Sequence, residues 1–214
     1  MLRGSDLLVA TGRVSNTRGI GLEHLGVELD SRGYIRVNEK LETSAPGVWA
    51  VGDCAGTPQF THAAYDDFRV VRDNLFGNGE SRTTRDRLIP SCTFTDPELV
   101  RIGLNEKQAR QRQIPYRVAS MRASSVLRTR TVSEPRGFLK MLIAADSDKI
   151  LGFTAFCVEA SEVLAAVQTA MAGGVPYTTL RDAIYTHPTM SEAFVFFLAD
   201  VPGQIYAGPT SSNR

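Results

Sequence analysis

Three side chains in this sequence have the chemistry and spacing to act on a ligand. His187 precedes Pro188, and Glu192 follows the histidine by five residues. Imidazole titrates near neutral pH and can transfer a proton, while a carboxylate on its other nitrogen fixes the tautomer. Asp53 follows Gly52 at the end of an apolar run, and an ionised carboxylate accepts hydrogen bonds from hydroxyl groups such as those of a sugar. The sequence therefore predicts proton transfer at one place and ligand binding at another.

Each of these residues also has a purely structural explanation. Thr189 and Glu192 have the spacing of a capping box, in which the glutamate closes the first turn of a helix. A histidine before a proline is often a simple turn residue, and so is a Gly-Asp pair at the end of a strand. Spacing alone leaves both explanations open.

A short buried strand is expected to position Asp53. Residues 48–51 are apolar and lie between Pro46-Gly47 and Gly52, as in a strand with both faces covered. Gly52 has no Cβ, so another group can approach its backbone closely. Open α/β sheets bind their ligands at the carboxyl ends of such strands.

A helix is expected over residues 61–76, ending at Gly77. Its amino end lies a few residues after Asp53, so free N–H groups and the positive end of the helix dipole would face the same ligand. An anionic cofactor fits that geometry. The expected buried stripe has apolar residues at steps of four, three and four: Ala64, Phe68, Val71 and Leu75.

Two motifs, more than a hundred residues apart, resemble one enzyme family. Residues 9–13 (Val-Ala-Thr-Gly-Arg), 33–37 (Gly-Tyr-Ile-Arg-Val) and 43–53 are similar to the second half of the flavin domain in the pyridine nucleotide-disulfide oxidoreductases. Residues 185–192 (Tyr-Thr-His-Pro-Thr-Met-Ser-Glu) resemble the family's His-Pro-Thr/Ser-x-x-Glu signature. The family includes dihydrolipoamide dehydrogenase, glutathione reductase and mercuric reductase. The resemblance covers essentially residues 6 to 200.

The resemblance implies FAD as cofactor, NAD(P)H as electron donor and a homodimer. It implies that His187 reaches the disulfide of the partner subunit and protonates the departing sulfur, while Glu192 orients the ring. An imidazolium there would also lower the pKa of the thiol. Pro188 is expected to hold the loop rigid through a cis bond, as in family members. The implied cofactor-binding residues are Gly12, Gly52, Asp53, Phe60, Thr61, His62 and Ala63.

The sequence indicates the family more sharply than it indicates the individual enzyme within the family. Dedicated mercuric reductases place a tyrosine where His187 stands and end in a vicinal cysteine pair, and this chain has neither feature. A mercuric-reductase-like enzyme remains open. Residues 60–73 and 180–182 look closer to a subgroup that includes oxidant- and metal-response reductases, with dihydrolipoamide dehydrogenase as the alternative. The sequence identifies neither the electron acceptor nor the choice between NADH and NADPH.

Composition limits the partners and the compartment. The chain has 214 residues, 43% hydrophobic and 22% charged, and its net charge of +1 gives no reason to expect nucleic acid or membrane lipid as a partner. The apolar runs are too short to span a bilayer. Strand-like Leu7-Leu8-Val9-Ala10 follows Met1 almost at once, which argues against a signal peptide, so a cytoplasmic location is predicted.

The cysteines support neither a disulfide framework nor a metal site. They are three in number and widely spaced, and we expect them to be small buried hydrophobic residues: Cys54, Cys92 and Cys157. Contact with the cofactor is the alternative for Cys54, which lies beside Asp53.

The predicted fold class is α+β. A partial flavin-binding α/β segment, residues 1–84, with strands at 7–10 and 34–37, is followed by an α+β dimerisation domain, residues 85–205, and a flexible tail, residues 206–214. In the second domain, Asn105 and Gln108 predict the capped start of a helix, and residues 162–172 predict a longer one ended by Gly173-Gly174. Its antiparallel sheet is expected from residues 89–94, 99–104, 116–121, 137–144 and 149–158, the last two forming a hairpin.

The glycine-rich turns and reactive cysteine pair of the family's amino-terminal half are missing from this sequence. We therefore expect the chain to be the carboxyl-terminal part of an FAD-dependent oxidoreductase, inactive by itself and completed by an amino-terminal half. The alternative is a homodimerisation module without catalysis.

Overall fold

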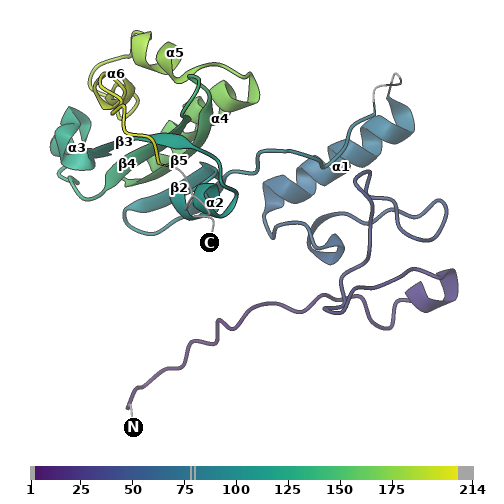
Figure 1. Ribbon diagram of the computed structural model, residues 1–214. Helices are drawn as coiled ribbons and strands as arrows, with labels where there is room; N and C mark the ends of the chain where they lie inside the picture. Colours follow the sequence, from purple (N-terminus) through teal and green to yellow (C-terminus); the bar gives the residue numbers. More distant parts are fainter. Residues whose placement is uncertain (1–2, 78, 80, 207–214) are drawn as a thin grey trace, which may run out of the picture. The chain divides into compact units, whose positions relative to one another are not determined.

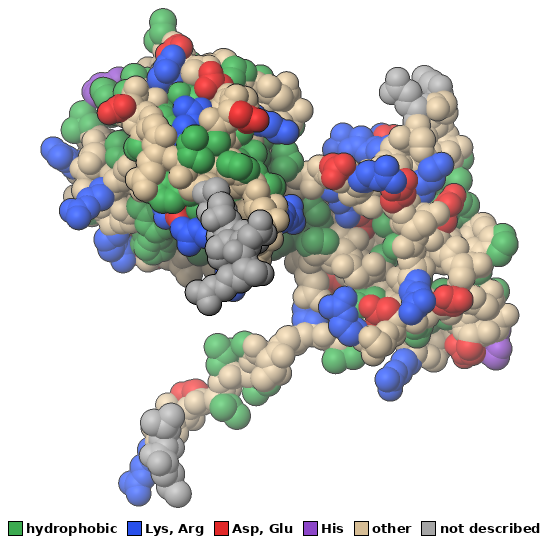
Figure 2. Space-filling model, viewed as in Figure 1, with side chains coloured by type: hydrophobic (Ala, Val, Ile, Leu, Met, Phe, Trp, Pro, Cys, Tyr) green, Lys and Arg blue, Asp and Glu red, His purple; other side chains and the backbone are tan. Residues whose placement is uncertain are grey.

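The computed structural model describes residues 3–77, 79 and 81–206 (Figure 1). The chain divides into two compact units, Met1–Arg87 and Leu88–Arg214. Among the described residues, no helix combines the length and the apolar composition needed to cross a membrane. Acidic and basic side chains are interspersed on the visible face of each unit (Figure 2), as the balanced composition leads one to expect.

The second unit is built on a five-stranded antiparallel sheet. Its strands follow the spatial order β1-β2-β5-β4-β3. The predicted hairpin is confirmed, because the last two strands pair in register from Phe138 opposite Phe156 to Ile143 opposite Ile150. The bounds are β1 Ser91–Thr93, β2 Glu98–Gly103, β3 Tyr116–Arg122, β4 Phe138–Ala144 and β5 Ile150–Cys157.

Helices cover both faces of this sheet. On one face, α4 (Ala160–Ala172) packs on β2 and β5, and α5 (Tyr177–Asp182) and α6 (Ala193–Phe197) complete the main core. On the other face, α2 (Glu106–Gln111) packs through Ala109 in a smaller apolar cluster. The segment between β3 and β4 holds a short 3-10 turn, η3 (Ala123–Ser125), and α3 (Leu127–Thr131), two elements that the sequence analysis did not anticipate.

Local sequence signals explain the helices of this unit. Asn105 and Gln108 form the predicted capping box at the start of α2, each side chain bonding the other's backbone N–H. The predicted helix α4 begins two residues earlier than expected and ends before Gly173. Its buried face carries residues at helical spacing: Ala160, Val163, Leu164, Val167 and Ala170.

The first unit contains little regular structure. It holds two 3-10 turns, η1 (Leu22–Leu25) and η2 (Gly52–Ala55), and the long helix α1 (Thr61–Phe76), whose bounds are those predicted. The strands predicted at residues 34–37 and 48–51 are wrong, since each reduces to one isolated bridge, Leu29 with Ile35 and Glu42 with Trp49.

The predicted strand at residues 7–10 is also wrong. This segment is extended, but Leu7 and Leu8 are each 88% exposed, and no described segment pairs with it. A strand requires a partner to satisfy its backbone N–H and C=O groups, and apolar composition alone does not supply one.

The predicted buried stripe of α1 is wrong as well. Phe68 and Leu75 are exposed, whereas the buried residues are Ala63, Asp67 and Val70. Apolar periodicity points to the wrong side because the centre of the buried face is an aspartate. Its contacts, described below, compensate for the burial of a charge.

Candidate functional site

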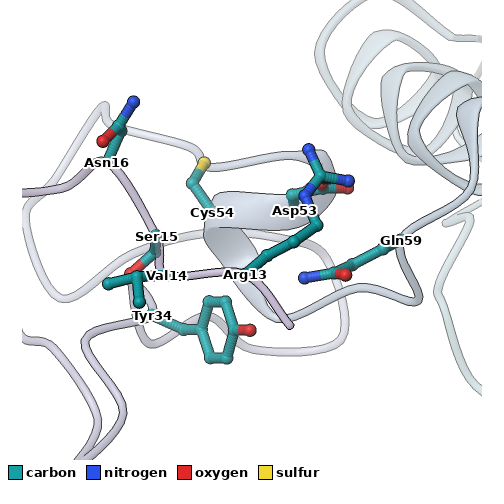
Figure 3. Close-up of a pocket in the computed structure, with 8 residues that line it drawn as sticks. All are labelled: Arg13, Val14, Ser15, Asn16, Tyr34, Asp53, Cys54 and Gln59. Atoms are coloured by element: carbon teal, nitrogen blue, oxygen red, sulfur yellow. Dashed lines mark ion pairs between the residues drawn. The ribbon is translucent and has the colours of Figure 1, made fainter. Parts of the chain in front are cut away.

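A pocket in the first unit holds the predicted ligand-binding acid (Figure 3). Its volume is about 210 Å³, and three segments contribute to it: residues 13–16, Tyr34 and residues 53–59. Asp53 lies in η2, and its Oδ2 is 2.9 Å from Nη1 of Arg13, whose side chain is 65% exposed while that of Asp53 is 40% exposed. The lining residues are Arg13, Val14, Ser15, Asn16, Tyr34, Asp53, Cys54 and Gln59.

Hydrogen bonds between distant parts of the chain form this pocket. The hydroxyls of Ser15 and Thr17 both donate to the carbonyl of Gly33, at 2.7 and 2.6 Å. The N–H of Ile35 donates to the carbonyl of Cys54 at 2.7 Å. These bonds bring Arg13, Tyr34 and Asp53 to one place without a regular sheet.

The pocket combines a hydrogen-bond acceptor with a cation. A carboxylate such as that of Asp53 is able to accept hydrogen bonds from hydroxyl groups, and a guanidinium such as that of Arg13 is able to donate to phosphate oxygens. Because an exposed ion pair contributes at most about 1 kcal/mol, a ligand that offers both kinds of group can displace it. Arg13 belongs to the Thr-Gly-Arg motif, but sequence reasoning did not identify it as a site residue.

A buried carboxylate fastens η2 to α1. Asp67 is fully buried, and its Oδ2 accepts from the N–H of Gly52 and from the hydroxyl of Thr57, each at 2.7 Å. Its Oδ1 accepts from Nη1 of Arg87 at 2.6 Å. Three donors, one of them the Arg87 cation, satisfy this carboxylate, so the turn that presents Asp53 is held at both ends.

The glycine at the start of η2 is required by packing. Gly52 has a φ of 69°, and a Cβ placed on it would lie 3.1 Å from Cβ of Ala64. The close approach that the sequence predicted at this glycine is therefore made by α1.

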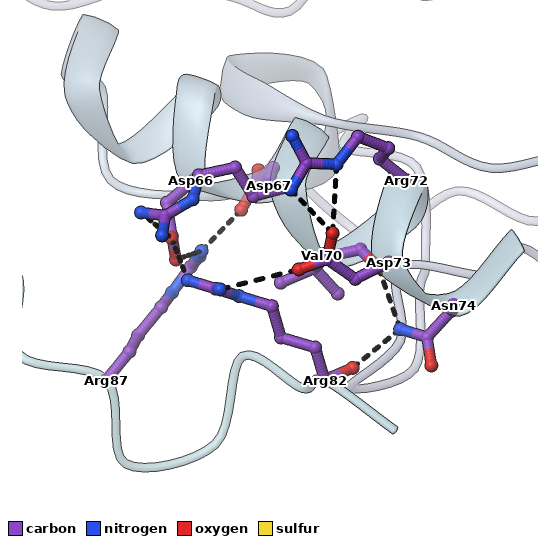
Figure 4. Close-up of polar contacts among 9 residues, drawn as sticks. Asp66, Asp67, Val70, Arg72, Asp73, Asn74, Arg82 and Arg87 are labelled. Carbon is purple, nitrogen blue, oxygen red and sulfur yellow. Dashed lines mark hydrogen bonds and ion pairs between the residues drawn. The ribbon is translucent and has the colours of Figure 1, made fainter. Parts of the chain in front are cut away.

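Further ion pairs hold the chain after α1 against that helix (Figure 4). Arg82 donates to Asp66 at 2.7 Å and pairs with Asp73 at 3.5 Å. The amide of Asn74 donates to the carbonyl of Arg82 at 2.6 Å. Hydrogen bonding from Arg72 is the main cause that lowers the pKa of Asp73.

The other predicted cofactor residues do not line this pocket. Gly12 precedes Arg13 and has a φ of 112°. Phe60 and His62 stack at 5.1 Å beside the exposed Thr61, at the start of α1. Ala63 is buried in the first unit. The binding roles of these residues stay predictions.

The second unit carries the histidine and the glutamate as a hydrogen-bonded pair. Nδ1 of His187 lies 2.7 Å from Oε2 of Glu192, and the peptide bond before Pro188 is cis. The histidine side chain is 64% exposed, whereas that of the glutamate is only 12% exposed. Since an ionised carboxylate only accepts hydrogen bonds, this contact assigns a proton to Nδ1.

A half-buried tyrosine on one side and a buried methionine on the other anchor the loop that carries this pair. The hydroxyl of Tyr185 donates to the carbonyl of Leu180 at 2.8 Å, and burial raises the pKa of that tyrosine. Met190 is 1% exposed within the main core. The capping box considered for Thr189 and Glu192 is only half formed, because the glutamate side chain bonds His187 instead.

The cysteines differ in their surroundings. Cys157 is buried, and desolvation raises its pKa to about 12, with Glu98 adding to the shift. Desolvation also raises the pKa of Cys92. The prediction that all three are buried holds for Cys157 alone, since Cys92 and Cys54 are half-buried and Cys54 lines the pocket. Within the described residues, no group of three potential metal ligands is present.

Comparison with known proteins agrees with this α+β architecture. The model of the pyridine nucleotide-disulphide oxidoreductase dimerisation domain matches residues 89–196, and a second model, pyridine nucleotide-disulphide oxidoreductase, matches residues 2–67. The chain belongs to the pyridine nucleotide-disulphide oxidoreductase family. The cofactors of this family are FAD and NAD(P)H.

Three relatives illustrate the similarity. The probable pyridine nucleotide-disulfide oxidoreductase RclA of Escherichia coli is 37% identical over 187 residues, which are 87% of this chain and 42% of that protein. Dihydrolipoyl dehydrogenase of Thermus scotoductus is 36% identical over 88% of this chain and 40% of its own length. A soluble pyridine nucleotide transhydrogenase of Pseudomonas putida is 34% identical over 90% of this chain and 42% of its own length.

A solved structure extends the likeness to three dimensions. The HOCl-induced flavoprotein disulfide reductase RclA from Escherichia coli aligns with a TM-score of 0.84 and 37% identity, over 89% of this chain and 44% of that one. The chain thus spans about two fifths of the length of the relatives it matches.

Loss of the Asp67 charge is expected to unfold the first unit more easily. In Asp67→Asn, an amide N–H₂ would replace one oxygen and face either the Arg87 donor or the Gly52 donor, and the charge that pairs with Arg87 would be lost, which lowers the free energy of unfolding by about 3 kcal/mol or more. Urea unfolding measures the change. The half-buried neighbour provides the control, because Asp66→Asn should cost about 1 kcal/mol or less. Equal losses in the two variants would contradict the assignment.

Alkylation should distinguish the three cysteines. Thiolates are the reactive species, so at about pH 8 a thiol with a pKa near 12 is ionised only to roughly one part in 10⁴. Iodoacetamide is expected to modify Cys54 first, Cys92 more slowly, and Cys157 at least about 100-fold more slowly than Cys54, as read by mass spectrometry. In denaturant all three should react alike. Native Cys157 reacting as fast as Cys54 would contradict its burial.

Proposed function

We propose that this chain forms the carboxyl-terminal part of an FAD-dependent oxidoreductase that passes electrons from NAD(P)H to a disulfide or a metal ion. Family membership supports the reaction class, and the exposed His187–Glu192 pair is the observation that carries the proposal. The similar Escherichia coli protein of solved structure is a flavoprotein disulfide reductase, which favours a disulfide as the acceptor. Dihydrolipoamide dehydrogenase and a mercuric-reductase-like enzyme remain the alternatives within the family.

The pocket around Asp53 fits part of FAD. A dinucleotide offers hydroxyls and phosphates, which match the carboxylate of Asp53 and the guanidinium of Arg13. A volume of about 210 Å³ is below the roughly 300–1,000 Å³ of whole-ligand pockets, so other parts of the enzyme would bind the rest. We assign Asp53 to a hydroxyl of the cofactor and the amino end of α1 to its anionic part.

Proton transfer at the disulfide of the partner subunit is assigned to His187. When bound, FAD supplies the electron pair that reduces the disulfide to a thiolate and a thiol. The imidazolium gives its Nε2 proton to the departing sulfur and becomes neutral with its remaining proton on Nδ1. Glu192, bonded to Nδ1, stabilises the imidazolium before the transfer. The exposure of the ring suits a substrate that arrives from outside this unit.

Homodimerisation would bring that disulfide to the histidine. Large apolar side chains are exposed near the pair in sequence, with Ile184 fully exposed and Phe196 70% exposed. Such residues are enriched in the centres of protein interfaces, and the matched domain is a dimerisation domain. We therefore propose that His187 of one copy serves the disulfide of the other.

A non-catalytic dimerisation module is the second candidate for the chain by itself. The second unit has a continuous core of its own across β2, β3, β4, β5, α4 and α6, independent of the pocket in the first unit. A Cys-x-x-x-x-Cys motif encoded upstream in the same reading frame would favour the enzyme.

In the complete enzyme, His187→Gln is expected to slow the half-reaction with the disulfide substrate by about 100-fold or more, because general acid catalysis typically contributes a factor of about 10²–10⁴ to the rate. Flavin reduction by NAD(P)H should be nearly unchanged. Stopped-flow absorbance of the flavin measures both half-reactions. His24→Gln, at an exposed histidine of the first unit, serves as the control and should leave both rates unchanged. If flavin reduction slows as much as the disulfide step, the acid-base assignment is wrong.

Asp53→Asn should weaken flavin binding in the complete enzyme. A hydrogen bond to a charged group contributes roughly 1.5–3 kcal/mol, so the Kd for FAD is expected to rise by about 10- to 100-fold. Flavin fluorescence after dialysis gives the measurement. Asp182→Asn removes an exposed acid that pairs with an arginine in the second unit, and should not change the Kd. Full flavin retention by Asp53→Asn would refute the role.

A further inference from the structure

We propose that Thr189 is a positioning residue for the His187–Glu192 pair, acting through a single side-chain hydroxyl. The proposal rests on the proposed function of that pair, since it explains how the pair keeps its geometry. The hydroxyl donates to the carbonyl of Thr186 at 2.8 Å and accepts from the N–H of Glu192 at 3.3 Å. One oxygen thus joins the residue before the histidine to the glutamate itself.

The two members of the pair differ in how firmly they are held. The glutamate side chain is 12% exposed, and its residue directly precedes α6, so its backbone position directs the carboxylate. The imidazole is 64% exposed and is hydrogen-bonded to that carboxylate. The orientation of His187 therefore depends on where the glutamate backbone and the Thr186 carbonyl are placed, and the Thr189 hydroxyl bonds both.

The loop does not need this hydroxyl to stay folded. Met190 is buried in the main core, and Tyr185 is tied to the carbonyl of Leu180. Both anchors lie outside the hydrogen bonds of Thr189. Its removal should therefore loosen the geometry of the pair while the second unit remains folded.

Threonine suits this task because of its branching. Two heavy atoms on Cβ restrict χ1, which keeps the hydroxyl aimed at both partners. Serine keeps the hydroxyl but loses the restriction, and valine keeps the shape but loses both hydrogen bonds. These two replacements at Thr189 separate the hydrogen bonds from the packing.

The tautomer of His187 gives a readout that a merely structural residue would not change. A carboxylate acceptor holds the proton on Nδ1, so its displacement lets the proton move to Nε2. The two ring nitrogens are distinguished by ¹⁵N NMR of the histidine-labelled chain at about pH 9, where histidine is ordinarily neutral. The His187→Gln spectrum identifies the signals.

We expect Thr189→Val to lower the ratio of Nδ1-protonated to Nε2-protonated His187 by about two- to fivefold, the range of one exposed charged contact. In Thr189→Ser, this ratio should stay close to that of the unsubstituted chain. Thr131→Val is the matched control, because the exposed Thr131 hydroxyl also donates at 2.8 Å to the carbonyl three residues earlier, that of Arg128. This control should leave the ratio unchanged.

Thermal unfolding of the same variants completes the test. The proposal is overturned if Thr189→Val lowers Tm without changing the tautomer ratio. It is also overturned if Thr189→Ser lowers the tautomer ratio as much as Thr189→Val does. The NMR measurement requires neither flavin nor substrate. An active His187→Gln enzyme would therefore remove the proposed function of the pair and leave the positioning result standing.

Discussion

The buried carboxylate of Asp67 is the constraint on which the first unit depends. A charge without solvent is costly unless donors and an opposite charge surround it, and Gly52, Thr57 and Arg87 meet that requirement. Each partner belongs to a different stretch of chain, so satisfying one side chain fixes η2, the turn after it and the segment that leaves α1. In this unit, hydrogen bonds and an ion pair hold these segments together without a regular sheet. They position η2 and therefore Asp53, which lies in η2 and lines the pocket.

The second unit reaches its order by the opposite route. Its sheet and helices bury a continuous apolar core, and the loop of the histidine is fixed because Met190 is part of that core. Met190, which is buried in the core, thus holds the loop that carries His187 and Glu192 at the surface of this unit. The contrast explains why a half-exposed hydrogen bond between His187 and Glu192 keeps a defined geometry without being buried.

Prediction from sequence succeeded where the signals were local. The Asn105 cap, the helix ended by Gly173 and the hairpin across residues 146–148 follow from spacing within a few residues. It failed at residues 7–10, where a strand needs a partner that apolar composition cannot reveal, and on α1, where a stripe predicted from apolar residues left out the buried Asp67. The motifs singled out Asp53, His187 and Glu192. Arg13 was missed as a site residue because its contact with Asp53 depends on the folded loops. Thr189 was considered only as a helix cap, because spacing shows its bond to Glu192 but not its bond to the Thr186 carbonyl.

The last described residue has a consequence for the sheet itself. Tyr206 exchanges two backbone hydrogen bonds with Tyr116, at 2.9 and 2.8 Å, and the two rings stack at 5.5 Å. Tyr116 begins β3, which is an edge strand, and unpaired edges are templates for aggregation. Tyr206, the first residue of the predicted tail, therefore pairs with backbone groups of Tyr116 that would otherwise be open at the edge of the sheet.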